Sequence, residues 1–301
     1  MNFTNLIFMF FFLQGSECFF QKVPFNQLDI LRFGFRVSTS FQGVKWPKLT
    51  NFNREKYKTL KVNNESLRYP DYYLRDFHAY NGGNLNWIAA EECMAASEVV
   101  MAFHNKNNTG RQTNEMIREK FMEITKRTLS KREKLNMVDM ACGIGLSTSI
   151  ISNNFEGNVV GVDMSPYFLN KAVELFPRIR FVHGNVESLD IPNNSQDIVF
   201  ISYLLHELPF KASVNVIKEA NRILRKGGKL AILDMDPNIK SSNCLRQYIF
   251  DNTEPYIEDY KLFYNVKDKV LELSGFSNII EIVDIYKTRI IVSNKQFDFN
   301  L

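Results

Sequence analysis

Cysteine is scarce in this chain: only four of its 301 residues are cysteines. They stand far apart, and none belongs to a close pair with zinc-ligand spacing: Cys18, Cys93, Cys142 and Cys244. Four cysteines in so long a chain also do not make a disulfide framework. The sequence therefore predicts neither a metal site nor a fold held together by disulfides.

An excess of one charge is missing as well. The chain has 37 lysines and arginines and 33 aspartates and glutamates, which leaves a formal net charge of +4. A protein directed at nucleic acid usually carries a more lopsided charge. We therefore expect no nucleic-acid partner. The apolar fraction of 45% is enough for one large or two small domains.

The N-terminus carries an apolar run, Leu6 to Leu13, that is far too short to span a bilayer, so we expect no stable membrane span. The run has the length of a signal-peptide core, and residues 1–18 end in a cleavage-site pattern. Residues 19–64 hold nine basic and two acidic residues, a composition typical of transit peptides. Together they resemble the two-part plastid leaders of algae with secondary plastids. A mitochondrial presequence, a secreted protein and a disordered basic arm remain alternatives, and in each case residues 1–64 stay outside the expected fold.

A glycine turn follows the apolar run at residues 137–140, as Ala141-Cys142-Gly143-Ile144-Gly145. It predicts a strand that turns sharply into a helix, and a loop of small residues at a helix N-terminus lets a ligand approach the backbone closely. The next apolar run ends at Asp163, whose carboxylate is placed to bind both hydroxyls of a ribose. The sequence therefore predicts a nucleoside-containing ligand. Asp163 could also cap the helix that begins near Ser165-Pro166.

The loop does not fit the best-known nucleotide motifs. The dinucleotide fingerprint needs a third glycine, and Thr148 stands in that position. No Gly-Lys-Ser/Thr follows the loop, which disfavours a phosphate-binding loop of the Walker type. What remains resembles motif I of the class I S-adenosylmethionine-dependent methyltransferases.

Four later segments resemble the same family in the same order. They correspond to its third strand and the loop beside the adenine, its fourth strand, its E-x-x-R-V-L-K-P-G-G segment and its fifth strand: residues 180–187, 195–202, 219–228 and 230–235. In the third of these we expect a helix with basic residues in its last turn and a glycine stop. The resemblance covers roughly residues 137–293.

The order of elements predicts an α/β fold. Strands and helices alternate at 136–141, 146–153, 158–163, 166–175, 179–183, 197–202, 211–225 and 229–235, which implies a parallel sheet with helices on both faces. Two last strands, 279–283 and 288–292, form a hairpin. We expect a Rossmann-like, seven-stranded, mostly parallel sheet with one antiparallel strand over residues 131–296. Residues 65–130, with helices at 87–103 and 113–129, form an aromatic-rich helical N-terminal cap.

The resemblance implies roles for individual residues. Gly143 and Gly145 lie against the methionine part of S-adenosyl-L-methionine, and Asp139 lies near its ammonium group. Asp163 takes the ribose and Met164 packs on the adenine, while Asn185 replaces the family's usual aspartate at the adenine amino group. The full expected cofactor set is Asp139, Ala141, Cys142, Gly143, Gly145, Asp163, Met164, Asn185, Val186 and Tyr203. For Cys142 we prefer a small filler of the turn over a nucleophile.

Two histidines are candidate general bases because the pKa of imidazole suits proton transfer. His206 follows the fourth strand, at the sheet edge where open α/β folds bind ligands; its alternative is a capping or hydrogen-bonded loop histidine. His78 lies in the aromatic segment 69–87, which resembles the N-terminal segment of a plant and algal branch of these methyltransferases. Those aromatics either line the acceptor pocket or pin a helix on the domain.

The predicted function is methyl transfer to a small-molecule acceptor. The N-P-P-Y/F motif of adenine N6-methyltransferases is absent after the fourth strand, where Ser202-Tyr203-Leu204-Leu205 stands, which argues against nucleic-acid acceptors. A cofactor-binding sensor or assembly factor without transferase activity is the alternative, and a nicotinamide oxidoreductase is a second. The sequence does not fix the acceptor, the O, N or C position of methylation, or the oligomeric state.

Overall fold

The structure is a computed structural model that describes residues 44–47, 60–78, 80–105, 107–129, 134–238, 254–283 and 286–299. The predicted signal peptide, 1–18, and most of the predicted transit-like segment, 19–64, lie outside the described residues. Among the helices that are described, none has the length and apolar character needed to cross a membrane.

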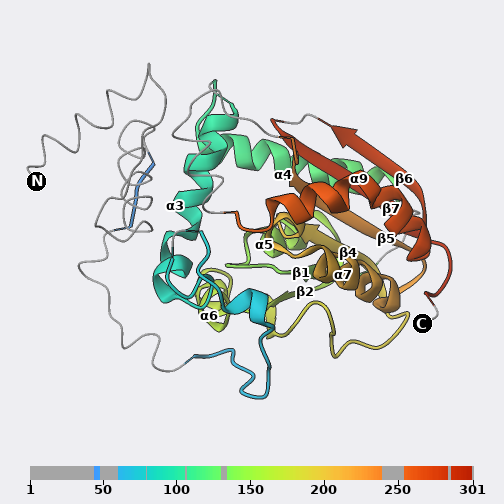
Figure 1. The fold of residues 1–301 in the computed structure, drawn as a ribbon, viewed down its shortest axis with the longest axis horizontal. Helices are drawn as coiled ribbons and strands as arrows, with labels where there is room; N and C mark the ends of the chain where they lie inside the picture. Colours follow the sequence, from blue (N-terminus) through green and yellow to red (C-terminus); the bar gives the residue numbers. More distant parts are fainter. Residues whose placement is uncertain are drawn as a thin grey trace, which may run out of the picture.

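One seven-stranded sheet forms the centre of the protein, in the order β3-β2-β1-β4-β5-β7-β6 (Figure 1). Its strands are β1 (Leu135–Met140), β2 (Gly157–Asp163), β3 (Arg180–His183), β4 (Gln196–Ser202), β5 (Leu224–Met235), β6 (Phe276–Val283) and β7 (Thr288–Lys295). The first five are parallel, and β7 runs antiparallel to both of its neighbours. The predicted Rossmann-like sheet with one antiparallel strand is confirmed.

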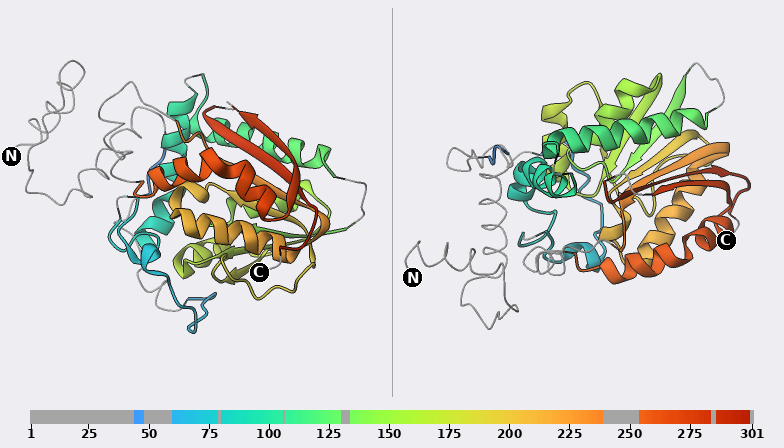
Figure 2. Two further views of the ribbon diagram at one scale, coloured as in Figure 1. Left: turned by 45° about the vertical axis from the view of Figure 1, so that its right-hand side comes forward. Right: turned by 90° about the horizontal axis from the view of Figure 1, so that it is seen from above.

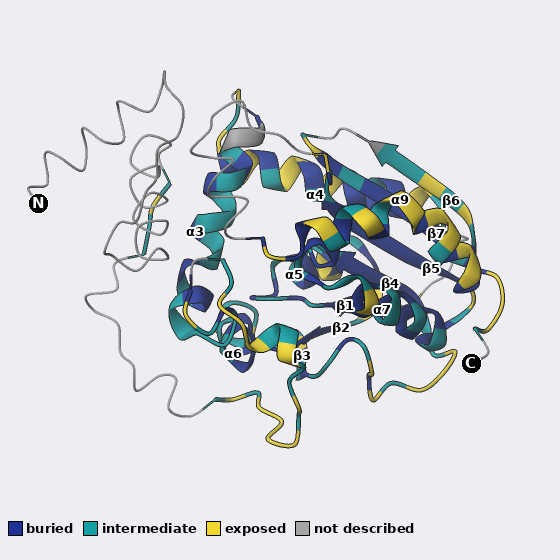
Figure 3. Cartoon of the chain, viewed as in Figure 1, coloured by how far each residue is buried: buried dark blue, intermediate teal, exposed yellow. Residues whose placement is uncertain are grey.

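The central strands are buried on both faces, as expected for a parallel sheet covered by helices. In β4, the five residues from Asp197 to Ile201 are all buried (Figure 3). Alternate residues point to opposite faces, so Val199 and Ile201 pack in one core cluster and Ile198 and Phe200 in another. The apolar run in the sequence therefore fills two cores at once.

Helices cover both faces of the sheet (Figure 2). They are α4 (Gly110–Arg127), α5 (Leu146–Asn154), α6 (Pro166–Leu175), α7 (Phe210–Ile223) and α9 (Ile257–Leu273). Apolar residues of α7 and α9 join the cluster of Val199 and Ile201, whereas those of α4 and α5 join the cluster of Ile198 and Phe200. The predicted two-sided helix cover is thus observed.

The helix α3 (Trp87–His104) precedes α4 and packs beside the glycine loop. Its Ala89 and Ala90 share a small core with Ile144 of that loop and with Phe168 of α6. The Asn86 side chain caps α3 by accepting a hydrogen bond from the N–H of Ile88. Because α3 packs against α6 and the loop after β1, it covers the carboxyl edge of the sheet (Figure 1).

Residues 60–64 were expected outside the fold, yet they contact the α/β domain. The N–H of Lys61 donates to Asn170 Oδ1 (3.4 Å), and that of Asn64 donates to His183 Nδ1 (2.8 Å). Val62 packs on the small core beneath α6. The chain therefore meets the domain five residues before the expected boundary at residue 65.

One predicted boundary is wrong. Residues 219–228 were read as a helix with basic residues in its last turn and a glycine stop, but α7 ends at Ile223 and β5 already begins at Leu224. Leu224 is extended (φ −67°, ψ 139°), so Arg225 and Lys226 lie on the strand. Gly227 has φ 77° and lies where the β4–β5 register shifts, so it accommodates an irregularity inside β5. The sequence had predicted that this strand starts after the glycines.

Candidate functional site

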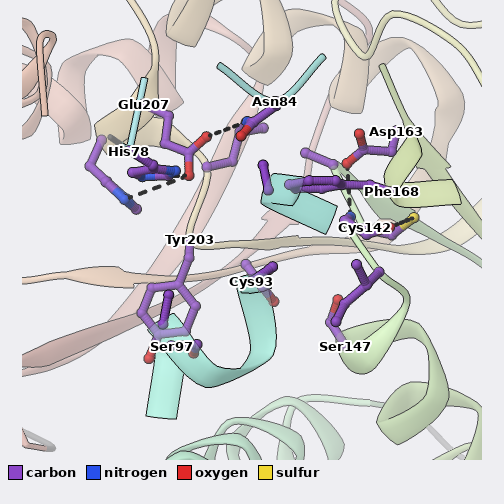
Figure 4. Close-up of a pocket in the computed structure, with 18 of the residues that line it drawn as sticks. His78, Asn84, Cys93, Ser97, Cys142, Ser147, Asp163, Phe168, Tyr203 and Glu207 are labelled. Carbon is purple, nitrogen blue, oxygen red and sulfur yellow. Dashed lines mark hydrogen bonds and ion pairs between the residues drawn. The ribbon is translucent and has the colours of Figure 1, made fainter. Parts of the chain in front are cut away.

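A single cavity of about 320 Å³ lies at the carboxyl ends of β1, β2 and β4, and its size is typical of ligand pockets. Its walls come from the glycine loop, α3, the aromatic N-terminal segment and the loop after β4. Figure 4 shows two polar groups on opposite sides, with Asp163 and Cys142 on one and His78 and Glu207 on the other. We call these the cofactor end and the acceptor end.

The glycine loop turns β1 sharply into α5 through left-handed backbone conformations. Ala141, Gly143 and Gly145 have φ values of 58°, 55° and 81°. A Cβ at Gly145 would also lie 2.7 Å from the ring of Phe181, so only glycine fits there without movement. The predicted tight turn is present, and Ala141, Cys142 and Gly143 line the cavity.

Asp163 ties the end of β2 to the glycine loop. Its Oδ2 accepts a hydrogen bond from the N–H of Gly143 (2.8 Å) and its Oδ1 from that of Ser165 (2.7 Å). Ser165, and not Asp163, caps α6, because its hydroxyl accepts from the N–H of Phe168. Burial raises the pKa of Asp163 to about 6, although the hydrogen bonds from these two N–H groups act to lower it. Each carboxylate oxygen keeps a second lone pair for a ribose hydroxyl.

Asp139 is completely buried behind the loop and carries an unsatisfied oxygen. Its Oδ2 accepts hydrogen bonds from Ser147 Oγ (2.6 Å) and Thr148 Oγ1 (2.7 Å), while Oδ1 has no partner among the described residues. Burial raises its pKa to about 6, although the two hydroxyls lower it. A buried carboxylate with a free oxygen favours a cation nearby, which fits the ammonium group of the expected cofactor. Ser147 lines the cavity, but Asp139 does not.

The residues expected around the adenine are only partly in place. Met164 and Val186 line the cavity. Asn185 does not, and its Oδ1 accepts a hydrogen bond from the N–H of Glu187 (2.9 Å) within its own loop. The structure therefore does not bring the Asn185 side chain to the place where the sequence put it.

Tyr203 presents a second unsatisfied group. Its hydroxyl is buried without a hydrogen-bond partner in the part of the chain that the structure describes, and its backbone is left-handed (φ 55°). The guanidinium of Arg118 on α4 lies 5.6 Å from the centre of the Tyr203 ring, a cation–π arrangement. Arg118 also lines the cavity. Sequence reasoning missed Arg118, which is one of many charged residues on an amphipathic helix.

The acceptor end holds four ionisable side chains that we call the imidazole–carboxylate cluster: His78, His206, Glu207 and Glu254. His206 and Glu207 belong to the short helix η4 (Leu205–Glu207). Nε2 of His78 lies 3.3 Å from Glu254 Oε1 and 3.6 Å from Glu207 Oε1. Nε2 of His206 lies 4.0 Å from Glu207 Oε1, and its Nδ1 lies 2.6 Å from Oδ1 of the buried Asp234. The structure thus brings together both predicted histidines.

The pKa values of this cluster oppose the predicted base role. Burial lowers the pKa of His206, but Asp234 and the cluster carboxylates outweigh it and raise the value to about 10. Burial also lowers the pKa of His78, and Glu254 and Glu207 again raise it above its usual range. Burial raises the pKa of Glu207. These shifts favour the protonated form of both imidazoles, whereas a general base must be neutral.

The thiol of Cys142 is not activated. The residue is 5% exposed, and burial raises the pKa of the thiol well above its usual range, with Asp163 and Asp139 adding to the effect. The thiolate is the nucleophilic form of cysteine, and here it is suppressed. The geometry agrees with the interpretation of Cys142 as a filler of the turn.

The aromatic N-terminal segment serves both of its expected purposes. Tyr72, Tyr73 and Tyr80 line the cavity. Tyr80 is also buried against α3, and its hydroxyl donates to Glu92 (3.0 Å). Tyr72 donates to Glu187 (2.6 Å) in the loop after β3. The segment therefore forms a wall of the cavity and fastens that wall to the domain.

Comparison with known proteins agrees with this geometry. Residues 138–232 match the family described as a methyltransferase domain. The demethylmenaquinone methyltransferase of Listeria welshimeri is 26% identical over 175 residues, which covers 54% of this chain and 73% of that protein. The ubiquinone/menaquinone biosynthesis C-methyltransferase of Campylobacter jejuni is 29% identical over 138 residues, covering 43% and 58%.

A solved structure of low sequence identity is also similar to part of this chain. Phosphoethanolamine N-methyltransferase 2 of Haemonchus contortus, in complex with S-adenosyl-L-methionine, superposes with a TM-score of 0.49 at 16% identity. The match covers 60% of this chain and 53% of the Haemonchus contortus enzyme. Residues 138–232 thus form a methyltransferase domain, and these similarities support an enzyme that uses S-adenosyl-L-methionine as methyl donor.

Proposed function

We propose that this enzyme methylates a small aromatic acceptor that carries ring hydroxyl groups, of the quinol type. The observation that supports this best is the continuity of the cavity, which joins the cofactor loop to the imidazole–carboxylate cluster along an apolar, aromatic wall. The wall suits a ring, and the cluster suits the hydroxyls at its edge. The two bacterial relatives, named for quinone methylation, support the same acceptor class.

The cofactor would bind at the opposite end. The glycine loop and Asp139 would hold the methionine part, Asp163 the ribose and Met164 the adenine. The guanidinium of Arg118 reaches the cavity and has no ion pair among the described residues, so we assign it to the cofactor carboxylate. A charge-assisted hydrogen bond of this kind contributes roughly 1.5–3 kcal/mol.

The reaction needs alignment more than proton chemistry. The methyl group moves from the sulfonium sulfur to the acceptor, the carbon–sulfur bond breaks, the acceptor loses one proton, and S-adenosylhomocysteine leaves. A buried cavity that places the acceptor in line with the sulfur supplies most of the rate. Carboxylates of Glu207 and Glu254 would accept hydrogen bonds from ring hydroxyls and so increase the electron density of the ring.

The test is label transfer from S-adenosyl-L-methionine carrying a tritiated methyl group. The acceptors are a short-chain demethylmenaquinol, its dimethyl ether, which lacks the hydroxyls, and phosphoethanolamine. We expect the quinol to be labelled at least about tenfold faster than its ether, with the position of the methyl group read by mass spectrometry. Labelling of phosphoethanolamine alone would overturn the acceptor class. Cofactor binding without transfer to any acceptor would favour a sensor or assembly factor.

We also propose that the protein works in a plastid and belongs to the plant and algal branch of the family. The apolar core at residues 6–13 and the basic, acid-poor composition of residues 19–64 support this location. Fusing residues 1–64 to a fluorescent protein in a plastid-bearing cell tests it. Accumulation in mitochondria or in the medium would contradict the proposal.

A further inference from the structure

The four side chains of the imidazole–carboxylate cluster come from three separate parts of the chain, and three of them, His78, His206 and Glu207, converge on one point of the cavity wall. One ligand-type atom from each of His78, His206 and Glu207 lies within 4.8 Å of the other two. Glu254 adds a carboxylate oxygen 3.3 Å from His78 Nε2. Two imidazole nitrogens and one carboxylate that lie close together, with a second carboxylate beside His78, form a donor set that suits a metal ion.

The distances fit a shared cation better than a set of direct hydrogen bonds. Ligands about 2.0–2.1 Å from a tetrahedral ion lie roughly 3.3 Å from each other. His78 Nε2 lies 3.3 Å from Glu254 and 3.6 Å from Glu207, and His206 Nε2 lies 4.0 Å from Glu207. The last two separations are too long for direct hydrogen bonds. His78, His206 and Glu207 are already close enough to share one ion, and Glu254 would join them from its place beside His78.

The orientation of His206 is fixed from behind. Oδ1 of Asp234 pairs with His206 Nδ1 (2.6 Å), and Oδ2 of Asp234 accepts from the N–H of Leu205 (2.8 Å). Asp234 is 2% exposed and stands at the end of β5, so the support is rigid. This arrangement turns Nε2 toward the cavity, and a carboxylate behind the ligating histidine is the usual second partner in metal sites.

The charge of the cluster calls for a cation. Glu254 is 8% exposed, and its Oε2 is buried without a hydrogen-bond partner among the described residues. Glu207 and Asp234 bring two further carboxyl groups to the same buried region. Three carboxyl groups thus face two imidazoles in this region, and a divalent ion bound between the cluster carboxylates would lower the cost of burying their charge.

We propose that His78, His206, Glu207 and Glu254 bind a divalent transition-metal ion at the acceptor end of the cavity. Imidazole nitrogens favour Zn²⁺, Fe²⁺ or Co²⁺ over Mg²⁺ and Ca²⁺, which prefer sites made of oxygen alone. In one respect this inference rests on the proposed function: a ring oxygen of the acceptor would bind as a fifth ligand from the side of the cavity, and the ion would polarise it. The binding of the ion itself requires no acceptor.

The experiment uses the full chain, produced without a histidine tag and freed of metal by a chelator. Co²⁺ is added while its visible ligand-field bands and its binding heat are recorded, and Zn²⁺ and Mg²⁺ compete afterwards. We expect one Co²⁺ per chain, displaced by Zn²⁺ and not by Mg²⁺. Absence of both bands and heat would overturn the proposal.

The variants are chosen to separate ligation from folding. Glu254→Gln removes one ligand charge and keeps the shape, and Glu258→Gln is the matched control, because Glu258 is an exposed acid on α9. We expect Glu254→Gln to weaken Co²⁺ binding at least about tenfold and Glu258→Gln to leave it unchanged. Asp234→Asn, which changes the partner of His206 Nδ1 without removing a ligand, should weaken binding by about 10–100-fold with altered bands. Equal affinity in Glu254→Gln and the parent would refute the assignment.

Two further measurements separate this inference from the proposed function. S-adenosyl-L-methionine binding to each variant is measured by calorimetry and should not change, since none of the changed residues belongs to the cofactor end. Full-rate label transfer to the quinol by metal-free enzyme that does not bind Co²⁺ would refute the metal site and leave the function standing. Co²⁺ binding without any labelled quinol would refute the proposed acceptor class and leave the metal site standing.

Discussion

The two ends of the cavity are built in different ways. At the cofactor end, most functional groups come from one turn and one strand tip, residues 139–148 and 163–164, and only Arg118 is added from the distant helix α4. At the acceptor end they are side chains from distant segments, His78, His206 and Glu254, held together only by tertiary structure. A binding site made from one short segment suits a cofactor that is always the same, whereas a site assembled from distant side chains can vary with the acceptor.

The two ends nevertheless share an electrostatic problem. Each contains a buried carboxyl group with an oxygen that no described residue satisfies, Asp139 Oδ1 at one end and Glu254 Oε2 at the other. Buried polar atoms without partners are rare in folded proteins, and a bound water, an ion or a ligand can supply the missing partner. At the cofactor end the missing partner would be an ammonium group, and at the acceptor end a metal ion.

The largest expected effect is on catalysis, from Glu207→Gln. The side chain keeps its shape but loses the charge that faces both histidines, so we expect methyl transfer to fall by about 10²–10³-fold. Cofactor affinity, measured by calorimetry, should stay within about twofold of the parent, because Glu207 lies at the acceptor end. Glu258→Gln is the control. A parallel loss of cofactor affinity would show that the two ends are not separable.

Asp139→Asn should raise the free energy of unfolding of the cofactor-free protein by about 3 kcal/mol at pH 7. Burial raises the folded-state pKa of Asp139 to about 6, against hydrogen bonds from Ser147 and Thr148 and the charge of Arg118, while the unfolded value stays near its ordinary range of about 4. The fold thus prefers the protonated carboxyl. The contribution of Asp139 to the free energy of unfolding is present below about pH 4 and is lost as pH rises through about 6.

The asparagine amide keeps an acceptor for both hydroxyls and carries no charge. Urea unfolding of the free protein should therefore show the variant more stable than the parent at pH 7, with little difference at pH 4.5. Cofactor affinity should fall, since the partner of the ammonium group is gone. Asp190→Asn serves as control, because Asp190 is exposed. A variant less stable than the parent at pH 7 would show that the ionised Asp139 is satisfied in the fold.

The fold and the cofactor end could be predicted because their signals are local. Alternating apolar runs and glycine turns placed the strands within a few residues, and the loop before α5 follows from Gly143 and Gly145 alone. The error at Leu224 arose because paired glycines suggested a helix stop, whereas Gly227 accommodates an irregularity inside β5. Asn185 illustrates a different limit: family position predicted its location at the adenine, whereas the structure shows its Oδ1 accepting from the N–H of Glu187 and does not place it in the cavity wall.

The acceptor end could be predicted only in part. His206 was noticed because it follows a strand at the ligand-binding edge, and Glu207, its neighbour, carried the same signal without being used. Glu254 and Arg118 had no signal, since an acid before a helix and a base on an amphipathic helix are common. The expectation that the chain has no metal site rested on sequence spacing, which cannot show ligands that only the folded chain brings together.

Asp163→Ala should weaken cofactor binding at least about tenfold, or about 1.4 kcal/mol. The change removes the contacts to the N–H groups of Gly143 and Ser165 and the predicted contact to the ribose. Calorimetry with S-adenosyl-L-methionine gives the affinity, and Co²⁺ binding at the acceptor end should not change. Cofactor affinity equal to that of the parent would show that the ribose assignment is wrong.

Tyr203→Phe should have the smallest effect and tests where the two ends meet. The hydroxyl is buried without a partner among the described residues, so removing it should leave the free protein unchanged or more stable by up to about 1 kcal/mol. The phenyl ring keeps its packing under Arg118. If the Tyr203 hydroxyl donates a hydrogen bond to the cofactor carboxylate, saturating S-adenosyl-L-methionine should raise the thermal unfolding temperature less in the variant than in the parent. If S-adenosyl-L-methionine stabilises both proteins equally, the cofactor does not contact this hydroxyl. A higher Michaelis constant for the quinol in the variant would then place Tyr203 at the acceptor end.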